Sequence, residues 1–301
     1  RFLAIVALLG SALMAQAELL KVRLGYPTAL HGEVAKVLEK TDIPKRHGLQ
    51  VEATFFQYGP PQIEALSARS LDVALTSLVP AASFLAKQPG AAAIIASLGN
   101  SGHGLVVPGD SPIRRLEDFR GKTIAVAYGS DSFADLAVAL KKAGLDPKKD
   151  VTLVNVPPNE QATVLERKLA DGVLIRQPAL TKLIEKSGAR EITRWPHHLV
   201  AIARTEFLDA HPEAREKLVA ALQDAVEYIR QHPQEAAAWF AQQLRQDPAA
   251  VEKLAAENPV FASGSQISVV PSAEFKAFAS ERAGELAEFG LTKVKVDFLF
   301  R

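Results

Sequence analysis

The chain has 301 residues, of which 48% are hydrophobic and 23% charged, which is ordinary globular composition with enough apolar material for two cores. Its 35 basic residues nearly balance 34 acidic ones, and no basic cluster is long enough to follow a phosphate backbone, so nucleic acid is not an expected partner. The absence of cysteine excludes a disulfide framework and a lipid attached through a cysteine.

The first 17 residues have the pattern of an export signal. They begin with arginine, continue through mostly apolar residues and end in Ala-Gln-Ala, the small-x-small pattern of a cleavage site. A membrane anchor is the alternative, but the apolar run is shorter than the roughly 20 residues that span a bilayer. The pattern predicts a signal peptide at 1–17, cleavage after Ala17 and a freely soluble periplasmic protein.

Short strand-like runs then alternate with helical patterns. After the first run, Val34, Val37 and Leu38 recur at helical spacing. Such alternation predicts an α/β fold with a mostly parallel sheet. The predicted strands are residues 19–26, 49–56, 71–77, 92–98, 121–128 and 151–156.

The middle of the chain repeats this strand-turn-helix scheme. A helix follows the turn after Tyr128, with Ser132 as its predicted N-cap and Gly144 as its stop. The segment 106–122 is rich in proline, glycine and charge, which predicts a surface connection with a short helix. From about Pro212 the pattern becomes helical, and one apolar face carries Leu218, Leu222, Val226 and Ile229.

No nucleophile elbow, P-loop, His-Glu-x-x-His or glycine-rich dinucleotide motif is present, so the sequence does not favour an enzyme. Glu117 and Asp118 fall in the charged connection, where solvation is expected. His197 and His198 are adjacent at the start of a strand and therefore point to opposite faces. One inward and one outward histidine is the prediction, with metal ligation as the alternative.

Polar turns follow the strands at five places. They cover residues 26–31, 57–61, 76–77, 101–103 and 129–132. In open α/β sheets ligands bind beyond the carboxyl ends of strands, where helix N-termini offer unpaired N–H groups. These turns predict a cleft that holds a small molecule.

Several segments in fixed order carry a resemblance to a known family. They include VRLGYPTALH, ALSARSLDVALTSLVPA, the long stretch from SPIRRLEDFRGK to VTLVNVPP, ADGVLIRQPAL and HLVAIARTEFLDAHPEARE. Together they resemble the periplasmic solute-binding proteins of ABC importers for nitrate, sulfonates and taurine, including the pyrimidine-precursor binders. The resemblance spans nearly the whole chain after the signal.

The resemblance implies a two-lobed periplasmic binding protein fold of type II with two hinge crossings. Lobe 1 would comprise residues 18–103 and 196–301, and lobe 2 residues 104–195, with the crossings at 99–103 and 194–198. It further implies a monomer that binds a small solute without converting it and delivers it to an ABC permease and its ATPase. Neither a cofactor nor a metal is expected.

Carried over position by position, the resemblance places ligand contacts at the strand-end turns and the hinge. Tyr26 would form a flat wall and His31 a hydrogen-bonding rim, and the alternative is that both merely pack the turn. The complete expected set is Tyr26, Pro27, His31, Tyr58, Thr76, Ser77, His103, Gly129, Ser130, Asp131, Ser132, Arg176 and His197.

Three positions depart from the family pattern. Phe133 stands where sulfonate binders often have histidine. Asp131 would repel an anion at a helix start. Arg176 replaces a common tryptophan and is expected inside the cleft, where it can clamp a sulfonate or carboxylate. The two charges suit a zwitterion, or pair with each other and leave a neutral site. Asp131 as a solvent-facing helix cap is a further alternative.

The expected ligand is therefore a sulfonate, a taurine-like molecule or a related anion or zwitterion. Two other functions fit the same fold. Fungal pyrimidine-precursor synthases are similar but carry a cysteine-rich motif, which a chain without cysteine lacks. A ligand-sensing domain would need an attached DNA-binding or transmembrane module.

Overall fold

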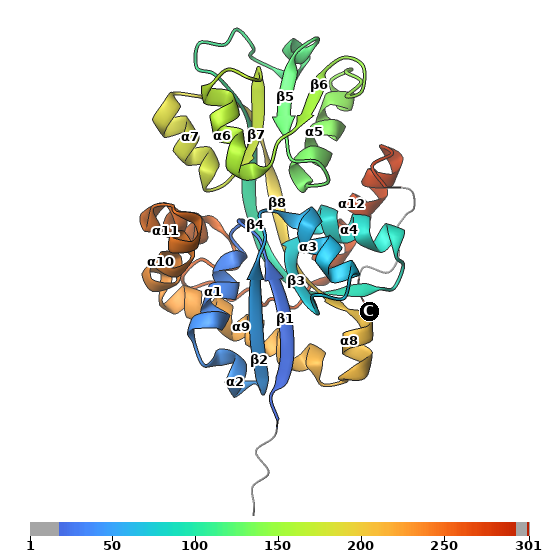
Figure 1. Ribbon diagram of the computed structural model, residues 1–301, viewed down its shortest axis with the longest axis vertical. Helices are drawn as coiled ribbons and strands as arrows, with labels where there is room; N and C mark the ends of the chain where they lie inside the picture. Colours follow the sequence, from blue (N-terminus) through green and yellow to red (C-terminus); the bar gives the residue numbers. More distant parts are fainter. Residues whose placement is uncertain (1–17, 293–299, 301) are drawn as a thin grey trace, which may run out of the picture.

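The structure, a computed structural model, describes residues 18–292 and 300, so the predicted signal peptide lies outside the described residues. One eight-stranded sheet runs through this part of the molecule in the order β2-β1-β3-β8-β4-β7-β5-β6 (Figure 1). Its strands are β1 Leu20–Tyr26, β2 Leu49–Phe55, β3 Val73–Ser77, β4 Ala92–Val107, β5 Thr123–Val126, β6 Thr152–Asn155, β7 Gly172–Arg176 and β8 Arg190–Arg204.

The sheet is parallel at its two ends and antiparallel in its middle. β1 pairs in parallel with β2 and β3, and β5 pairs in parallel with β6 and β7. β8 is antiparallel to β3 and β4, and β4 is antiparallel to β7. The six predicted strands are confirmed as β1 to β6, and the expectation of a mostly parallel sheet holds only for its two ends.

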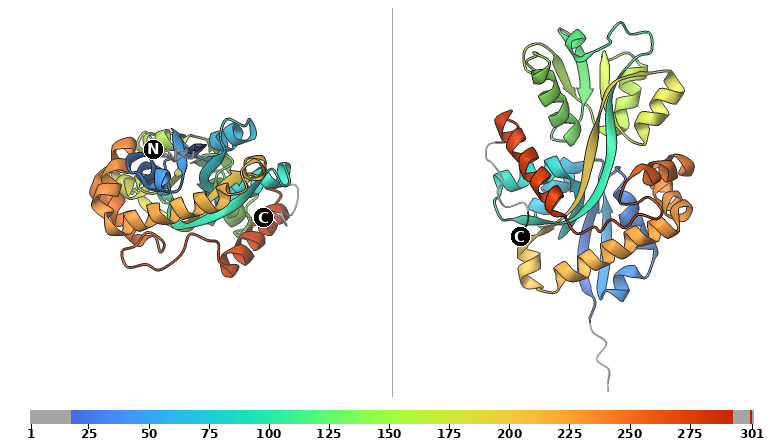
Figure 2. Two further views of the ribbon diagram at one scale, coloured as in Figure 1. Left: turned by 90° about the horizontal axis from the view of Figure 1, so that it is seen from below. Right: turned by 180° about the vertical axis from the view of Figure 1, so that it is seen from behind.

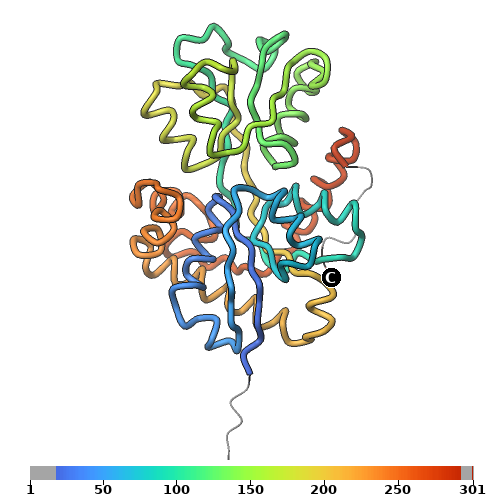
Figure 3. The backbone as a smooth tube through the Cα atoms, in the orientation of Figure 1, coloured from blue at the N-terminus to red at the C-terminus, as the bar shows by residue number. Residues whose placement is uncertain are grey.

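Two lobes lie along the long axis, and β4 and β8 cross between them (Figures 1 and 3). At the crossing Asn100 pairs with His198 and His103 with Trp195, beyond an irregularity of register between Ser97 and Asn100. The expected two-lobed fold with two crossings is confirmed. The residue limits of 103/104 and 195/196 fall inside these strands and stay a prediction.

Lobe 1 combines both ends of the described chain. It holds β1 to β3, helices from the first part of the chain and helices from the last part (Figure 1). The first set is α1 Gly32–Lys40, α2 Ile43–Arg46, α3 Gly59–Ser67 and α4 Leu78–Lys87, and the second is α8 Thr205–Ala210, α9 Ala214–Gln231, α10 Pro233–Leu244, α11 Pro248–Glu257 and α12 Ala273–Glu288.

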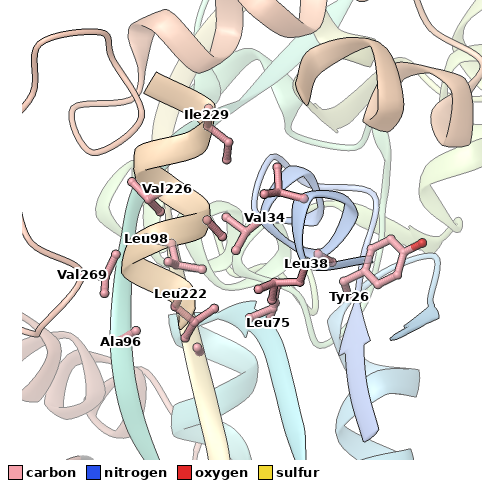
Figure 4. Close-up of a cluster of buried hydrophobic side chains, with 14 of the residues drawn as sticks. Tyr26, Val34, Leu38, Leu75, Ala96, Leu98, Leu222, Val226, Ile229 and Val269 are labelled. Carbon is pink, nitrogen blue, oxygen red and sulfur yellow. The ribbon is translucent and has the colours of Figure 1, made fainter. Parts of the chain in front are cut away.

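The largest core of lobe 1 forms where α1 and α9 cover one face of the sheet (Figure 4). The predicted stripe of Val34, Val37 and Leu38 is buried, which confirms the helical spacing. The predicted apolar face of α9 is buried as well, at Leu218, Leu222, Val226 and Ile229. Each such side chain contributes about 1.5–3 kcal/mol by leaving water, so the two ends of the sequence depend on each other for stability.

Lobe 2 has helices on both faces of its strands. It contains the short 3₁₀ helix η1 Leu116–Phe119, α5 Asp131–Lys142, α6 Pro158–Glu166 and α7 Ala179–Ser187. α5 packs on one core and α6 and α7 on another. Strand β7 is therefore fully buried, as is usual for parallel strands covered on both sides. It ends at Arg176, which enters the space between the lobes.

The start of α5 differs from the prediction. Ser130, and not Ser132, is the N-cap: its hydroxyl accepts from Phe133 N at 3.3 Å and donates to the Ala127 carbonyl at 2.6 Å. The chain turns at Gly129, where φ is +72°, so the helix begins immediately after Ser130. Asp131 is consequently the first residue of the helix. Gly144, with φ +74°, follows its end as expected.

Helix α12 belongs to lobe 1 but reaches lobe 2. Figure 2 shows it beside the β4–β8 crossing when the molecule is seen from behind. Lys142 of α5 bonds Glu285 of α12 at 2.8 Å, and Lys141 bonds the carbonyl of Phe289 at 2.7 Å. Arg282 contacts Asp135 of α5. No helix in residues 18–292 combines the length and hydropathy needed to cross a bilayer.

Candidate functional site

Polar side chains from both lobes meet at the β4–β8 crossing. We call seven of them the inter-lobe cluster: His31, Thr76, Ser77, His103, Asp131, Arg176 and His197. All seven are buried, none with more than 6% of its surface exposed. The cluster gathers at the carboxyl ends of β1, β3 and β7 and at the N-terminus of α5 because parallel strands on each side of the crossing direct their ends toward the space between the lobes.

Three histidines form the centre of the cluster. His197 of β8 has its Nε2 2.7 Å from Ser77 Oγ. Its ring lies 5.7 Å from that of His103 and 6.4 Å from that of His31, centroid to centroid. Burial lowers the pKa of all three, that of His31 to about 3 with a further contribution from the Arg176 charge. They are therefore neutral imidazoles near neutral pH, each able to donate one hydrogen bond and accept another.

Asp131 joins the two lobes. Its Oδ1 accepts from the backbone amide of Val79 in α4 at 3.3 Å, and its Oδ2 lies 3.7 Å from His197 Nε2. Burial and the neighbouring Asp135 raise its pKa to about 7. The alternative of a solvent-facing helix cap is wrong, because Asp131 is only 5% exposed.

Arg176 is buried at the end of β7, as expected for a residue inside the cleft. Among the described residues its guanidinium has no hydrogen-bond or ion-pair partner within 4 Å, so the expected alternative of a pair with Asp131 is not found. Burial lowers its pKa, whereas Asp131 and Tyr58 oppose that shift. The cluster thus contains a desolvated cation without a partner.

Several buried polar atoms of the cluster lack hydrogen-bond partners. They are both ring nitrogens of His31, Nδ1 of His103 and of His197, Thr76 Oγ1 and Asp131 Oδ2. Buried polar groups are normally paired, and an unpaired one costs about 1–3 kcal/mol. Such a concentration indicates a place prepared for a polar partner.

A cavity of about 300 Å³ lies at the crossing and is lined by neighbours of the cluster, not by the seven cluster residues themselves. It adjoins the cluster through Gln177, which follows Arg176, through Ser101, which pairs with His197, and through Trp195, whose ring is 6.0 Å from that of His103. Ser101 Oγ is another buried atom without a partner. Leu254 and Glu257 of α11 also line the cavity, as does Asn258, which follows α11. This volume suits a small solute.

Other expected site residues lie around the cluster. Gly129 approaches the opposite lobe: a Cβ added there would be 3.1 Å from Pro60 Cγ. Tyr58 precedes α3 and lies close enough to Arg176 to influence its pKa. Ser130 caps α5, and Ser132 is buried in its first turn. Pro27 lies in the turn before α1, and its carbonyl oxygen would be 2.7 Å from a Cβ added at Gly32.

Tyr26 lies apart from the cluster. Its ring packs 5.6 Å from that of Phe55, and its hydroxyl accepts from Lys36 Nζ at 3.4 Å. The side chain is part of the lobe 1 core (Figure 4). For Tyr26 this placement favours the packing interpretation over a wall of the binding site.

The sequence analysis did not predict that His103 contacts a carboxylate, Asp135, which in turn pairs with Arg282. His103 Nε2 lies 2.9 Å from Asp135 Oδ2, and Asp135 contacts Arg282 of α12. Asp135 stands four residues after Asp131 on the same helix, a spacing that the sequence displays. Arg282 follows 147 residues later, and no local pattern connects the two.

The structure also shows where the adjacent pair His197 and His198 and the carboxylates Glu117 and Asp118 lie. His198 lies with its ring 4.4 Å from Phe278 of α12 while His197 enters the cluster, as the opposite-face argument predicted. Glu117 and Asp118 both lie in η1 near Arg115, outside the inter-lobe cluster. Among residues 18–292 and 300, no set of three or more histidine or acidic side chains is arranged to hold a metal ion.

Two α/β lobes joined by two strands, with a polar cluster between them, define the class of periplasmic binding protein folds. The chain belongs to the NMT1-like family, whose model matches residues 15–245.

Named relatives agree with this assignment. The chain is 30% identical to a Bacillus subtilis (strain 168) protein named for binding aliphatic sulfonates, over 71% of this chain and 66% of the relative. It is 31% identical to the taurine-binding periplasmic protein of Escherichia coli (strain K12), over 66% and 63%. The alkanesulfonate-binding protein SsuA from Xanthomonas axonopodis pv. citri, solved with MOPS, matches its fold with a TM-score of 0.78 at 20% identity, over 94% of this chain and 97% of that chain.

Proposed function

We propose that this protein is the periplasmic solute-binding component of an ABC importer. It captures a small organic solute between its lobes and delivers it to a membrane permease. The observation that carries this proposal is the set of buried, unpaired polar atoms from both lobes beside a cavity of about 300 Å³. A solute that pairs those atoms stabilises the closed arrangement, and a membrane partner distinguishes closed from open.

The charges of the cluster limit the solute to an anion or a zwitterion. Its histidines are neutral, so Arg176 is its one full charge, and Asp131, whose pKa is raised to about 7, is partly ionised near neutral pH. Arg176 is the group that pairs with a sulfonate or carboxylate. Asp131 is the group that accepts a hydrogen bond from an amine or hydroxyl on the same solute. The sulfonate and taurine named for the relatives combine such features.

Binding without chemical conversion is the mechanism that we propose. No nucleophile in the cluster is paired with a base in the manner of a catalytic triad: the Ser77 hydroxyl contacts His197, but no carboxylate orients the other ring nitrogen, Nδ1, which is unpaired. Hydrogen bonds and one charge pair are sufficient for capture. Release then requires only that the lobes separate at the permease.

A thermal-shift screen of residues 18–301 tests the proposal. Taurine, alkanesulfonates, nitrate, carboxylates, amino acids and pyrimidines are each supplied in excess. A solute at about 100 times its dissociation constant adds roughly 2.7 kcal/mol of stability. For a compound that binds, compaction in small-angle scattering confirms closure, and its recovery unchanged after incubation confirms binding alone. No binding by any of these classes, or turnover of a bound one, contradicts the proposal.

A further inference from the structure

The contact between Asp131 and α4 brings together two helix N-termini from different lobes. Asp131 is the first residue of α5, and Val79 is the second residue of α4. The Val79 amide donates to Asp131 Oδ1 at 3.3 Å. An amide in the first turn of a helix has no partner within that helix, so a carboxylate from lobe 2 satisfies a donor of lobe 1.

The start of α4 has the properties of an anion site. Its N-cap, Ser77, makes no side-chain hydrogen bond to the helix, because its hydroxyl is held by His197 at 2.7 Å. The amides of Leu78 and Val79 and the helix dipole therefore face the space between the lobes, where negative charge is favoured; Pro80, the third residue of the helix, has no N–H to add. Thr76, just before Ser77, is wholly buried and its hydroxyl is unpaired. These groups together we call the α4 anion site.

Asp131 fills this site incompletely. One oxygen accepts from the Val79 amide, while Oδ2 is buried without a hydrogen-bond partner, 3.7 Å from His197 Nε2. The Ser77 hydroxyl is near enough to lower the pKa of the carboxyl, but less than burial raises it. Arg176 is near enough to influence the carboxyl electrostatically but does not pair with it. The molecule therefore has two places suited to negative charge, and its own carboxylate occupies one of them.

We propose that Asp131 determines specificity by occupying the α4 anion site, so that the acidic group of the solute is directed to Arg176. This inference rests on the proposed function in one respect, namely that the solute binds in the same cleft. Asp131 thereby excludes a second anionic group from the cleft. It also supplies a contact between the lobes that does not depend on the solute.

Replacing Asp131 with alanine tests this inference with methanesulfonate as the probe. Removal of the carboxylate vacates the α4 anion site, so Asp131→Ala should bind methanesulfonate at least tenfold more tightly than the unaltered protein, measured by thermal-shift titration at constant ionic strength. Asp131→Asn keeps an oxygen acceptor for the Val79 amide and should gain much less. Asp110→Ala, which removes a carboxylate exposed in lobe 2, should gain nothing.

The double variant Asp131→Ala with Arg176→Met identifies where the probe binds. If the inference holds, the double variant keeps most of the gain, because the α4 anion site does not require Arg176. Loss of the whole gain means that Asp131 merely screened Arg176, and this overturns the inference. So does an equal response of Asp131→Ala and Asp110→Ala. Asp131→Ser serves the same comparison if the alanine variant does not fold.

The outcome is separable from that of the solute screen. Gain of methanesulfonate binding by Asp131→Ala that persists without Arg176 supports the α4 anion site even when no screened solute binds. Conversely, a solute that binds through Arg176 supports the proposed function even when Asp131→Ala gains nothing.

Discussion

His31 shows how burial turns a single residue into a pH-dependent contribution to stability. It is wholly buried, and an interaction with the backbone of Leu75 offsets only part of the cost of charging it there. Its pKa of about 3 in the folded protein lies below the ordinary value of 6.5. Between these values the unfolded chain binds a proton that the folded protein does not. Acidification therefore favours unfolding through His31, by up to about 1.4 kcal/mol per pH unit.

We predict that His31→Gln flattens the pH dependence of stability. Between pH 6.5 and 4.5 the free energy of unfolding of the variant should rise by about 2 kcal/mol relative to that of the unaltered protein. Asp131 has the opposite effect on stability: because its pKa is raised to about 7, stability falls as pH rises from about 4 to 7. The variant and the unaltered protein both contain Asp131, so its effect cancels in the difference. Urea denaturation at the two pH values measures the difference. Parallel profiles, equal to those of the exposed His232→Gln control, would refute the prediction.

We predict that Arg176 contributes to solute binding and not to stability. As a buried cation without a partner it is costly to the folded protein, so Arg176→Met should leave the melting temperature unchanged or raise it. The affinity for an anionic solute should fall about 10- to 100-fold, the loss of a charged hydrogen bond of roughly 1.5–3 kcal/mol. Calorimetric titration with the solute from the screen measures this. Equal affinity in Arg176→Met and in the exposed Arg167→Met would remove Arg176 from the binding site.

At the scale of elements, the turn before α5 illustrates what sequence can establish. Glycine and serine after an apolar run predicted a strand, a turn and a helix, and all three are present. The cap was assigned two residues too late, since Ser130 and Ser132 are both good N-caps and only the positive φ of Gly129 decides between them. Strand β7 was not predicted, because a five-residue apolar run that ends in arginine is too short to distinguish from helix.

The same turn allows a matched pair of glycine substitutions. Gly129 and Gly144 stand at the two ends of α5 with φ of +72° and +74°. A Cβ meets nothing within 4 Å at Gly144 but lies 3.1 Å from Pro60 of lobe 1 at Gly129. Gly144→Ala should lose about 1 kcal/mol of stability to backbone strain.

Gly129→Ala should lose at least as much stability and should also hold the lobes apart. We expect a larger radius of gyration in small-angle scattering and a solute affinity lowered several-fold, because the new methyl group intrudes on the closed contact. The prediction fails if the two alanine variants have the same radius of gyration and the same affinity.

At the scale of the whole molecule, α12 connects the lobes through charge. Arg282 contacts Asp135, which lies 2.9 Å from His103 at the crossing, and both Arg282 and Asp135 are largely buried. Lys142 and Glu285 form a second pair, in which the lysine is 63% exposed. Burial should make the first connection much more important than the second.

Substitution of each cation compares the two connections. Arg282→Met leaves the buried Asp135 without its cation and should cost about 2–3 kcal/mol of stability, somewhat less than a fully buried pair. Lys142→Met should cost less than about 1 kcal/mol, as is usual for an exposed pair. Urea denaturation of both variants measures this, and equal losses would show that α12 is held to lobe 2 by packing alone.

The whole molecule shows most clearly which features the sequence could predict and which it could not. Local periodicity predicted most strands and helices, and the strand-end turns predicted the neighbourhood of the site. The Val79–Asp131 and Asp135–Arg282 contacts could not be predicted from the sequence, because they depend on how closely the two lobes approach each other. Tyr26 adjoins the site in sequence yet packs in the core, since neighbouring strand residues face opposite ways.

The crossing strands have one more consequence. β4 and β8 form a two-stranded ribbon shared by both lobes, and its regular pairing is interrupted between Ser97 and Asn100. If the two lobes separate, β4 and β8 must twist or bend at the crossing. They should do so most easily where their hydrogen-bonded pairing is interrupted. His103 lies on β4 and His197 on β8, so both side chains are attached to these crossing strands. If the solute bonds their nitrogens, as we propose, it stiffens the crossing strands directly, and no further element is needed to couple binding to the movement of the lobes.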